Sequence, residues 1–390
     1  MNIGEIQSQL KKMGLDGWLL YDFQGSNPIT RKISGMQGGL VTRRWFYWIP
    51  CEGEAEVFCH SIERQSFSRL DVKKRYFASW QELEEGLAAM LAGHRKIAME
   101  YSPFCAIPYV SRVDAGTVEL VKKLDKLVVS SADLVQYFEA RWTEEQFQMH
   151  LEASRSLMAI LFATFERIRD SVRAGAPLSE YSAQRFILDR FREGGLTAAS
   201  LPIVAVNENS GNPHFDVEAE AARPIRSGDF LLIDLWAKLQ RPSSVYADYT
   251  WVAFLGETVP ERFVHIWEVV RSARDAATNL VHENYPKGVE LRGWQVDGAA
   301  RKLIQEAGYG AHFVHRTGHS IGEEDHGNGA NMDGLETKDE RRLIPHTCFS
   351  IEPGIYLPEF GIRSEVNVFL RETDVVVTGD PIQQEIHRIF

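Results

Sequence analysis

Two acidic residues stand inside stretches that otherwise predict buried β-strands. Asp234 follows the apolar residues 230–233, and Asp248 lies among the largely aromatic and apolar residues 245–251. A lone buried carboxylate costs several kcal/mol unless a partner offsets its charge. If the two stretches form a hairpin centred on residue 241, the aspartates lie across from one another on one face. Facing acids repel, so a cation between them is the natural partner.

The same pattern recurs near the C-terminal end. Glu352 and Glu365 lie in two strand-like stretches, and the midpoint between them falls within the turn-like residues 357–360. Strand alternation places Arg363, Glu365 and Asn367 on one face. A salt bridge to Arg363 explains one buried glutamate, but four acids in two matching hairpins require more positive charge than one arginine supplies.

Histidines accompany these acids. His315, His319 and His326 lie beside glycines within residues 312–326, where a substrate can approach the backbone closely, and His214 follows a proline in a polar loop. Any one of them, taken alone, reads as an ordinary polar or capping residue. The nearby acids favour a functional role for the group.

Four carboxylates and an imidazole form a hard, oxygen-rich ligand set, which suits Mn²⁺ and tolerates Co²⁺ or Zn²⁺. Two divalent ions would offset the four acidic charges. Two such ions, roughly 3.5–4 Å apart, bridge a water molecule, lower its pKa and stabilise the oxyanion of a hydrolysed amide. The predicted chemistry is two-metal hydrolysis.

The motifs that carry these residues resemble those of the pita-bread metallopeptidases, which include methionine aminopeptidase, aminopeptidase P, prolidase and creatinase relatives. The matching blocks follow the family's order: Pro213-His214, the paired aspartates, residues 318–322, Glu352-Pro353-Gly354 and residues 361–365. The resemblance covers the whole length, because aminopeptidase P and prolidase also begin with a small α/β domain.

The resemblance implies a metal-binding role for five residues. Asp234 would chelate one ion, and His319 with Glu352 would hold the other. Asp248 and Glu365 would bridge both ions. Glu352 would in addition shuttle a proton beside the attacking water.

The resemblance also implies roles outside the metal ligands. His214 and His326 would be catalytic residues that stabilise the transition state, and His315 and Arg363 would contact the substrate. Arg363 could grip the terminal carboxylate of a dipeptide. The alternative is that Arg363 pairs with a nearby acid such as Glu359.

Helices and strands must position this set. A helix at residues 3–13, strand-like runs at 17–21, 45–49, 55–58 and 96–99, and a helix near 82–92 predict an α/β domain over residues 1–135, which the resemblance likens to the creatinase/prolidase N-terminal domain. A capping box at Thr143 and Gln146 opens a long amphipathic helix, and further helices are expected at 181–191, 261–281 and 294–307. Residues 140–390 are therefore the expected catalytic domain, with the α+β pita-bread fold of a curved antiparallel sheet and outer helices.

Charge, cysteine spacing and the lengths of apolar stretches exclude several classes of protein. The 390 residues carry a formal net charge of −11, which argues against nucleic-acid and anionic-membrane partners. The four cysteines form no CxxC pair, and no stretch has the length of a signal-peptide core or a membrane span. A soluble cytoplasmic protein is expected, with a homodimer as its assembly.

The expected activity is that of a metallopeptidase that hydrolyses Xaa-Pro bonds in short proline-containing peptides and releases the N-terminal residue, as an Xaa-Pro aminopeptidase or an Xaa-Pro dipeptidase. A creatinase-like non-peptidase hydrolase and a non-enzymatic binding module on the same fold are the alternatives, and the complete set of five ligands disfavours both. The chain departs from the family pattern at Trp236, Val366 and Gly327 and in the 14-residue spacing of the aspartates.

Overall fold

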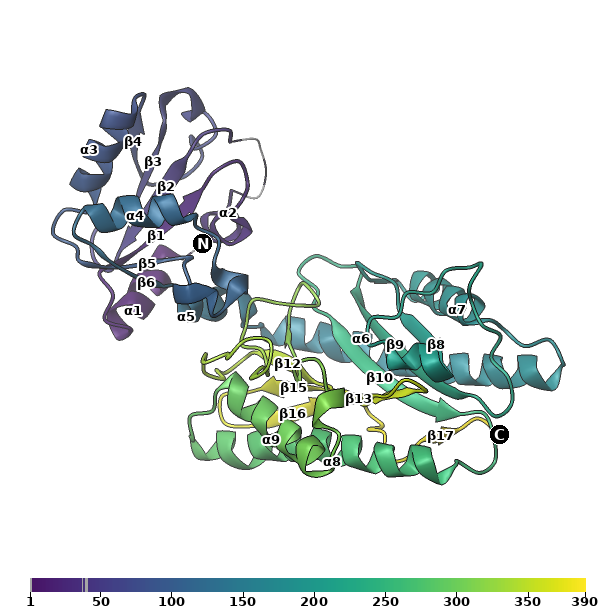
Figure 1. Ribbon diagram of the computed structural model, residues 1–390. Coiled ribbons are helices and arrows are strands. Elements are labelled where there is room, and N and C mark those ends of the chain that lie inside the picture. Colours follow the sequence, from purple (N-terminus) through teal and green to yellow (C-terminus); the bar gives the residue numbers. More distant parts are fainter. Residues whose placement is uncertain (1, 37, 39–40) are drawn as a thin grey trace. The chain divides into compact units, whose positions relative to one another are not determined.

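The computed structural model describes residues 2–36, 38 and 41–390, and the chain divides into two compact units, residues 1–139 and 140–390 (Figure 1). Within the described residues, no helix is both long enough and apolar enough to cross a lipid bilayer.

The first unit is built on a mixed six-stranded sheet with the order β4-β3-β2-β1-β5-β6. Its strands are β1 (Gly17–Asp22), β2 (Trp45–Pro50), β3 (Glu56–His60), β4 (Lys73–Phe77), β5 (Lys96–Met99) and β6 (Leu127–Ser130). Its helices are α1 (Ile3–Lys12), α2 (Pro28–Ser34), α3 (Trp80–Met90), α4 (Ala115–Lys123) and α5 (Ala132–Val135).

Alternation along β1 explains why helices cover both faces of this sheet. Trp18 and Leu20 pack in one buried cluster with residues of α1, α2 and α5, whereas Leu19 and Tyr21 pack in another with residues of α3 and α4. Successive strand residues point to opposite faces, so a strand that is apolar throughout requires cover on both.

The second unit holds three sheets between pairs of long helices. Strands β7 (Leu196–Thr197), β8 (Ile203–Val206), β9 (Phe230–Leu239), β10 (Ala247–Phe254) and β17 (His387–Arg388) form the largest. Strands β11 (Ser320–Ile321), β12 (Cys348–Ile351), β15 (Val366–Leu370) and β16 (Val375–Thr378) form the second, and β13 (Gly354–Tyr356) pairs with β14 (Gly361–Arg363).

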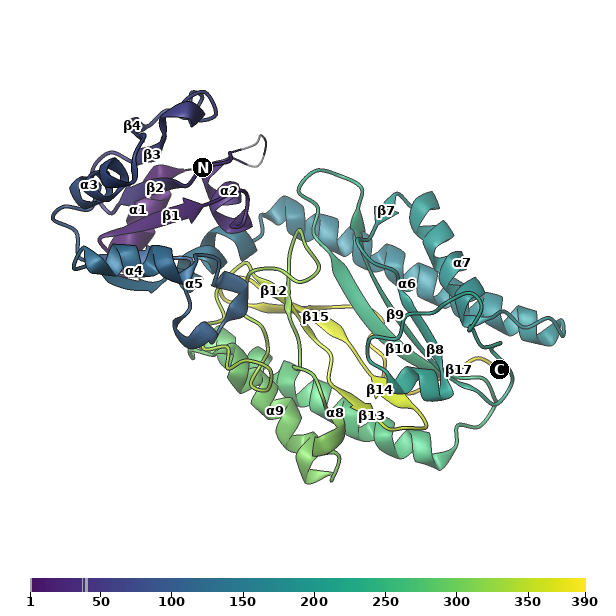
Figure 2. The same ribbon diagram turned by 45° about the horizontal axis from the view of Figure 1, so that its top comes forward.

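The helices of this unit lie outside the strands. Figure 2 shows α6 (Glu144–Arg173) and α7 (Glu180–Glu193) on one side, and α8 (Glu261–Asn284) and α9 (Gly293–Glu306) on the other. The predicted capping box is present at the start of α6, where Thr143 accepts from the Gln146 N–H at 3.2 Å and Gln146 accepts from the Thr143 N–H at 2.9 Å. The expected architecture of an α/β unit followed by a sheet with outer helices is confirmed.

The register of the first predicted hairpin differs from expectation. In the antiparallel pairing of β9 and β10, Asp234 lies opposite Thr250 and Asp248 lies opposite Trp236. The expectation that the two aspartates lie directly across from one another is wrong. The hairpin is centred on residue 242 rather than 241, with Ser243 at a positive φ of 57° in the turn. The two-residue offset preserves the parity of the strands, so both aspartates remain on one face as diagonal neighbours.

The second hairpin has the predicted register, although its ladder is interrupted. Ile351 pairs with Val366 and Gly354 pairs with Arg363, so Glu352 and Glu365 occupy the gap between the two paired segments. The interruption leaves both glutamates outside the strand ladder while the flanking pairs hold them opposite each other.

Candidate active site

Three buried side chains from separate segments of the second unit converge on one point. Asp248, His319 and Glu365 each offer a ligand atom, and these atoms lie within 4.8 Å of one another. The Nε2 atom of His319 is 3.5 Å from Oδ2 of Asp248 and 3.3 Å from Oε1 of Glu352. The structure therefore brings four of the five predicted ligands into direct proximity.

Asp234, the fifth predicted ligand, is joined to this group by Arg363. The Nη2 group of Arg363 donates a hydrogen bond to Oδ2 of Asp234, and its Nε atom is 3.9 Å from Oε2 of Glu352. The charge of Asp234 also raises the pKa values of Asp248 and Glu365. All five predicted ligands thus share one electrostatic centre.

The carboxylates of this centre lack sufficient partners within the described residues. Oδ1 of Asp234, Oδ1 of Asp248 and Oε1 of Glu365 are buried without a hydrogen-bond partner. Burial is the main cause that raises the pKa of each of these acids, and neighbouring carboxylates raise those of Asp248 and Glu365 further. Orphaned carboxylate oxygens beside an imidazole fit divalent cations, because coordination would satisfy the oxygens and offset the charge together.

Hydrogen bonds from neighbouring strands fix Asp248 and Glu365. Asn367 on β15 accepts from the Asp248 N–H at 3.0 Å and donates to the Asp248 carbonyl at 2.8 Å. Thr250 on β10 donates to Oε2 of Glu365 at 3.0 Å and accepts from Nε of Arg363 at 2.9 Å. Sequence reasoning did not single out Thr250, although its place two residues after Asp248 put it on the same strand face.

His319 is positioned by close contact with β12. A Cβ on the preceding Gly318 would lie 1.9 Å from the Ser350 carbonyl oxygen, so glycine is required where the two backbones meet. The Ser350 hydroxyl accepts from the His319 N–H at 2.9 Å and donates to Oε1 of Glu352 at 3.0 Å. Burial is the main cause that lowers the pKa of His319 to about 3, which keeps its imidazole neutral and able to bind a metal ion.

His315 and Arg363 meet at the hydroxyl of Tyr356. Nδ1 of His315 lies 2.7 Å from the Arg316 carbonyl, so this nitrogen donates, and Nε2 accepts from the Tyr356 hydroxyl at 2.7 Å. Nη1 of Arg363 donates to the same hydroxyl at 3.0 Å and to the Pro213 carbonyl at 3.2 Å. Sequence reasoning missed Tyr356.

The alternative that Arg363 pairs with an acid is confirmed, but the partner is Asp234 rather than Glu359: the side chain turns inward, and only 3% of Arg363 is exposed. Strand alternation had already placed Arg363 on the face of Glu365, where the other acids of the centre lie.

The two predicted catalytic histidines lie at the more exposed edge of the centre. The rings of His326 and His319 have centroids 4.0 Å apart, and the electrostatic interaction with His319, followed by burial, lowers the pKa of His326 to about 2. His214 is exposed, and its charge contributes to the pKa values of Glu352, His315 and His326. Both histidines therefore lie beside the acids without belonging to the central group.

Asp325 is a further acid of the site that sequence reasoning missed. Its carboxylate groups with His319 and His326, with one ligand atom from each within 4.8 Å of the others. Burial, followed by the charges of Asp234 and Glu352, raises the pKa of Asp325 to about 8. The run Glu323-Glu324-Asp325 beside a histidine was the available signal, but nothing in it shows which of the three acids points inward.

Two buried ion pairs anchor the segment that carries His315, His319 and His326. At its start, Asp297 on α9 accepts from the N–H and the hydroxyl of Thr317, and Arg301 bridges Asp297 to the carbonyls of Phe313 and His315.

At the end of this segment, Asn331 accepts from the Ser320 N–H at 3.0 Å and donates its own N–H to Asp339 at 2.8 Å. Asp339 in turn pairs with Arg341, which donates to the Asn328 carbonyl at 2.8 Å.

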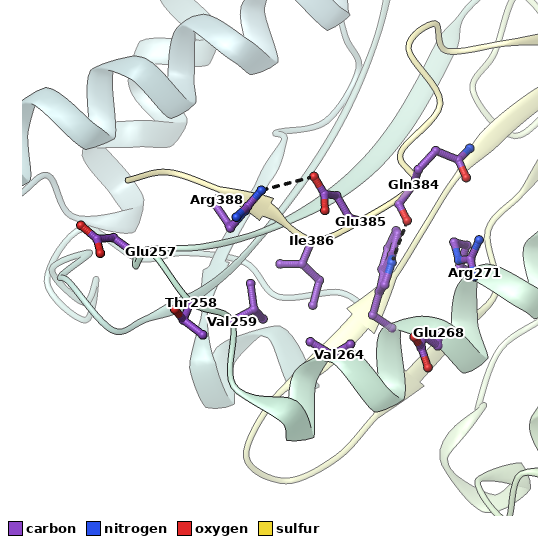
Figure 3. Close-up of a pocket in the computed structure, with 11 residues that line it drawn as sticks. Glu257, Thr258, Val259, Val264, Glu268, Arg271, Gln384, Glu385, Ile386 and Arg388 are labelled. Carbon is purple, nitrogen blue, oxygen red and sulfur yellow. Dashed lines mark hydrogen bonds and ion pairs between the residues drawn. The ribbon is translucent and has the colours of Figure 1, made fainter.

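A pocket of about 440 Å³ lies elsewhere in the second unit (Figure 3). It is lined by residues from the start of α8, such as Trp267 and Arg271, and from the C-terminal segment, such as Gln384 and Arg388. None of the predicted site residues lines it, so it belongs to a different part of the surface.

Curated proteins resemble about half of this chain. Over 202 residues the chain is 31% identical to an Xaa-Pro dipeptidase of Lactobacillus delbrueckii subsp. lactis, an alignment that covers 52% of this chain and 49% of the relative. The chain thus spans about half the length of the first curated relatives that it matches.

Solved structures match over nearly the full length. The dipeptidase PepE from Mycobacterium ulcerans superposes with a TM-score of 0.73 at 21% identity, covering 99% of this chain and 96% of the other. A dipeptidase from Pyrococcus horikoshii OT3 superposes with a TM-score of 0.64 at 25% identity, covering 100% of both chains.

The model of metallopeptidase family M24 matches residues 152–377, more than half of the chain. This segment contains all five predicted metal ligands, both predicted catalytic histidines and the two ion pairs that anchor their segment. The chain belongs to metallopeptidase family M24.

Proposed function

We propose that the protein is a metal-dependent peptidase that hydrolyses Xaa-Pro bonds in short peptides and releases the N-terminal residue. The observation that carries the proposal is the buried group of Asp248, His319 and Glu365, whose carboxylates retain unpartnered oxygens among the described residues. The relatives named Xaa-Pro dipeptidase support the choice of substrate.

The residues fit two divalent ions, with Mn²⁺ as the favoured metal. Asp234 would hold one ion, His319 and Glu352 the other, and Asp248 and Glu365 both. When bound, the ions supply Lewis acids, which acidify water and polarise a carbonyl group.

Glu352 is suited to hold and transfer the proton of the attacking water. Its Oε1 atom accepts from Ser350 at 3.0 Å, and burial raises its pKa. A base whose pKa is raised toward the working pH accepts a proton more readily and can return it to the leaving nitrogen. His214 and His326, at the edge of the centre, would donate hydrogen bonds to the developing oxyanion.

An enzyme specific for proline must recognise its substrate without a hydrogen bond from the amide N–H of that residue, because proline has none. We propose that His315 and Arg363, joined through Tyr356, contact the proline residue and the group beyond it. Nη2 of Arg363 pairs with Oδ2 of Asp234, so a dipeptide carboxylate would have to share the guanidinium with Asp234 or displace it. The proposal therefore favours dipeptidase over aminopeptidase activity.

The test compares hydrolysis of Ala-Pro, Ala-Pro-Ala and Ala-Ala by the Mn²⁺-loaded protein and by its Arg363→Ala and Arg363→Lys variants. We expect Ala-Pro to be the best substrate and Arg363→Ala to reduce its kcat/KM more than that of the tripeptide. Equal rates on Ala-Ala and Ala-Pro would contradict proline specificity. Equal losses on dipeptide and tripeptide would contradict the carboxylate contact and favour an aminopeptidase.

A further inference from the structure

Asp325 presents a carboxylate with open hydrogen-bonding capacity at the edge of the proposed metal centre. Among the described residues, its buried Oδ1 atom has no hydrogen-bond partner. Its Oδ2 atom is 3.8 Å from Nε2 of His326, which is longer than a hydrogen bond. The carboxylate therefore keeps hydrogen-bonding capacity that the described residues leave unused, and 21% of the Asp325 side chain is exposed.

The protonation of His326 shows which kind of group this edge of the site would accept. Nη2 of Arg316 lies 3.2 Å from Nδ1 of His326, and a guanidinium only donates, so Nδ1 accepts and the ring proton resides on Nε2. That N–H points along the Asp325 side of the ring. At this edge Asp325 is therefore the side chain that can accept from a ligand, whereas Nε2 of His326 can only donate.

The charges at the site distinguish Asp325 from the other acids. Two divalent ions would neutralise the four carboxylates of Asp234, Asp248, Glu352 and Glu365. Asp325 is outside that ligand set, so its charge would remain available to the substrate. An alkylammonium has three donors and one positive charge, which complements the carboxylate of Asp325.

We propose that Asp325 binds an alkylammonium group of the substrate's N-terminal residue, either its α-amino group or a basic side chain. This inference rests on the proposed peptidase function and names the substrate class of the same site, peptides that carry a free amine close to the scissile bond. Asp325 is then a determinant of specificity, whereas Glu324 beside it is exposed and plays no part.

Two substrate pairs separate the two sources of the ammonium. Ala-Pro and propionyl-Pro differ only in the α-amino group, and Lys-Pro and norleucyl-Pro differ chiefly in the side-chain ammonium. Both pairs are assayed with the Mn²⁺-loaded protein and with its Asp325→Asn, Asp325→Ser and Glu324→Gln variants. Glu324→Gln is the matched control, since it removes one negative charge from the same loop.

We expect the wild type to prefer the amine-bearing member of at least one pair, and both Asp325 variants to reduce that preference on the order of 10- to 100-fold in kcat/KM. If the Asp325 variants lose the preference for Ala-Pro over propionyl-Pro, Asp325 binds the α-amino group. If they lose the preference for Lys-Pro over norleucyl-Pro, it binds the side-chain ammonium. Glu324→Gln should leave both ratios unchanged.

The inference is overturned if the variants lower kcat/KM equally for all four peptides, or if they lose bound Mn²⁺ by elemental analysis, which would make Asp325 a metal ligand. Hydrolysis of none of these peptides by the wild type would instead contradict the proposed function. In that case, calorimetric titration of Lys-Pro and norleucyl-Pro into the same proteins still tests Asp325, and equal affinities in wild type and Asp325→Asn would overturn the inference.

Discussion

At the scale of single residues, the site combines an excess of buried acids with two guanidinium groups. Arg363 pairs with Asp234 and lies 3.9 Å from Glu352, and Arg316 lowers the pKa of Asp325. These arginines offset part of the negative charge but leave Oδ1 of Asp248 and Oε1 of Glu365 without partners among the described residues. The bridging acids should therefore respond most strongly to substitution.

Replacing Asp248 or Glu365 by alanine should remove bound metal and peptidase activity together, because the remaining acids then lack the shared ligand. Elemental analysis of the Mn²⁺-loaded protein should find nearly two bound ions per chain in the wild type. In each variant the number of bound ions should fall to one or none. Cys51→Ser, remote in sequence from every ligand, is the control and should change neither quantity. Near-normal turnover in either alanine variant would show that the ligand assignment is wrong.

Alanine at His214 or His326 should act on turnover rather than on metal content. Neither side chain belongs to the central ligand group, and a positioned donor or acid–base residue contributes on the order of 10²–10⁴ to kcat. Steady-state kinetics paired with elemental analysis checks this. Loss of metal in either variant would make that histidine a ligand.

At the scale of helices and strands, the site depends on how closely neighbouring backbones approach. Sequence reasoning predicted the register of Glu352 and Glu365 because a short turn fixes the pairing by symmetry. The same reasoning misplaced Asp234 and Asp248 by two residues, because the longer turn around Ser243 can shift its centre without changing which faces are apolar.

Contacts between segments far apart in the sequence were beyond prediction. Periodicity indicates which face of α9 is buried, but nothing local shows that Asp297 and Arg301 hold the backbone of residues 313–317. Likewise, the inward orientation of Asp325 depends on the path of its loop.

Gly318→Ala should test the close approach of His319 to β12. The added methyl group would lie 1.9 Å from the Ser350 carbonyl, so we expect the free energy of unfolding to fall by about 1–3 kcal/mol and metal affinity to fall with it. Gly298→Ala in α9 is the matched control: a Cβ there meets nothing within 4 Å, and alanine in a helix should add about 0.5–1 kcal/mol. Urea unfolding measures both; equal stability of the two variants would contradict the packing argument.

His150 on α6 should make the protein acid-sensitive. Its Nδ1 atom donates to the Tyr246 carbonyl at 2.7 Å, and Nε2 accepts from Thr378 at 2.8 Å. Burial lowers its pKa from 6.5 to about 4. Between these values the unfolded chain binds the proton that the folded state excludes, so stability is complete above pH 6.5 and is lost as the pH falls toward 4.

The effect of His150 can be isolated by substitution. Between pH 7 and pH 5, the lowered pKa of His150 should reduce the free energy of unfolding by about 2 kcal/mol. The His150→Asn variant should not show this reduction. Urea unfolding of both proteins at the two pH values provides the measurement. Parallel losses in the two proteins would assign the acid sensitivity to other groups.

At the scale of the whole molecule, each unit has hydrophobic clusters of its own, while every predicted site residue belongs to residues 140–390. The first unit also contains a buried polar centre. Glu100 accepts hydrogen bonds from Trp18 at 2.6 Å, from Asn27 and Thr30 at 2.9 Å, and from Ser131 at 3.1 Å.

Calorimetry should therefore resolve two thermal transitions. Addition of Mn²⁺ should raise the midpoint of the transition of residues 140–390, because a ligand stabilises the unit that binds it. Glu100→Ala should lower the midpoint of the transition of residues 1–139, because the four groups that donate hydrogen bonds to Glu100 then lose their acceptor. A single transition that responds to both changes would show that the chain unfolds as one cooperative body.

The paired anchors at Asp297–Arg301 and Asp339–Arg341, with strand β11 and the backbone bonds of Gly322 and Gly327, leave residues 323–326 as a short tether between two fixed ends. Such a tether can drift in sequence without disturbing the fold, because the bonds that hold its ends involve none of its side chains. A combinatorial library confined to this stretch, with His326 kept, would sample new substrate preferences on an unchanged metal centre. Sequence changes confined to this stretch are one physical route by which enzymes with the same fold can evolve different substrate specificities.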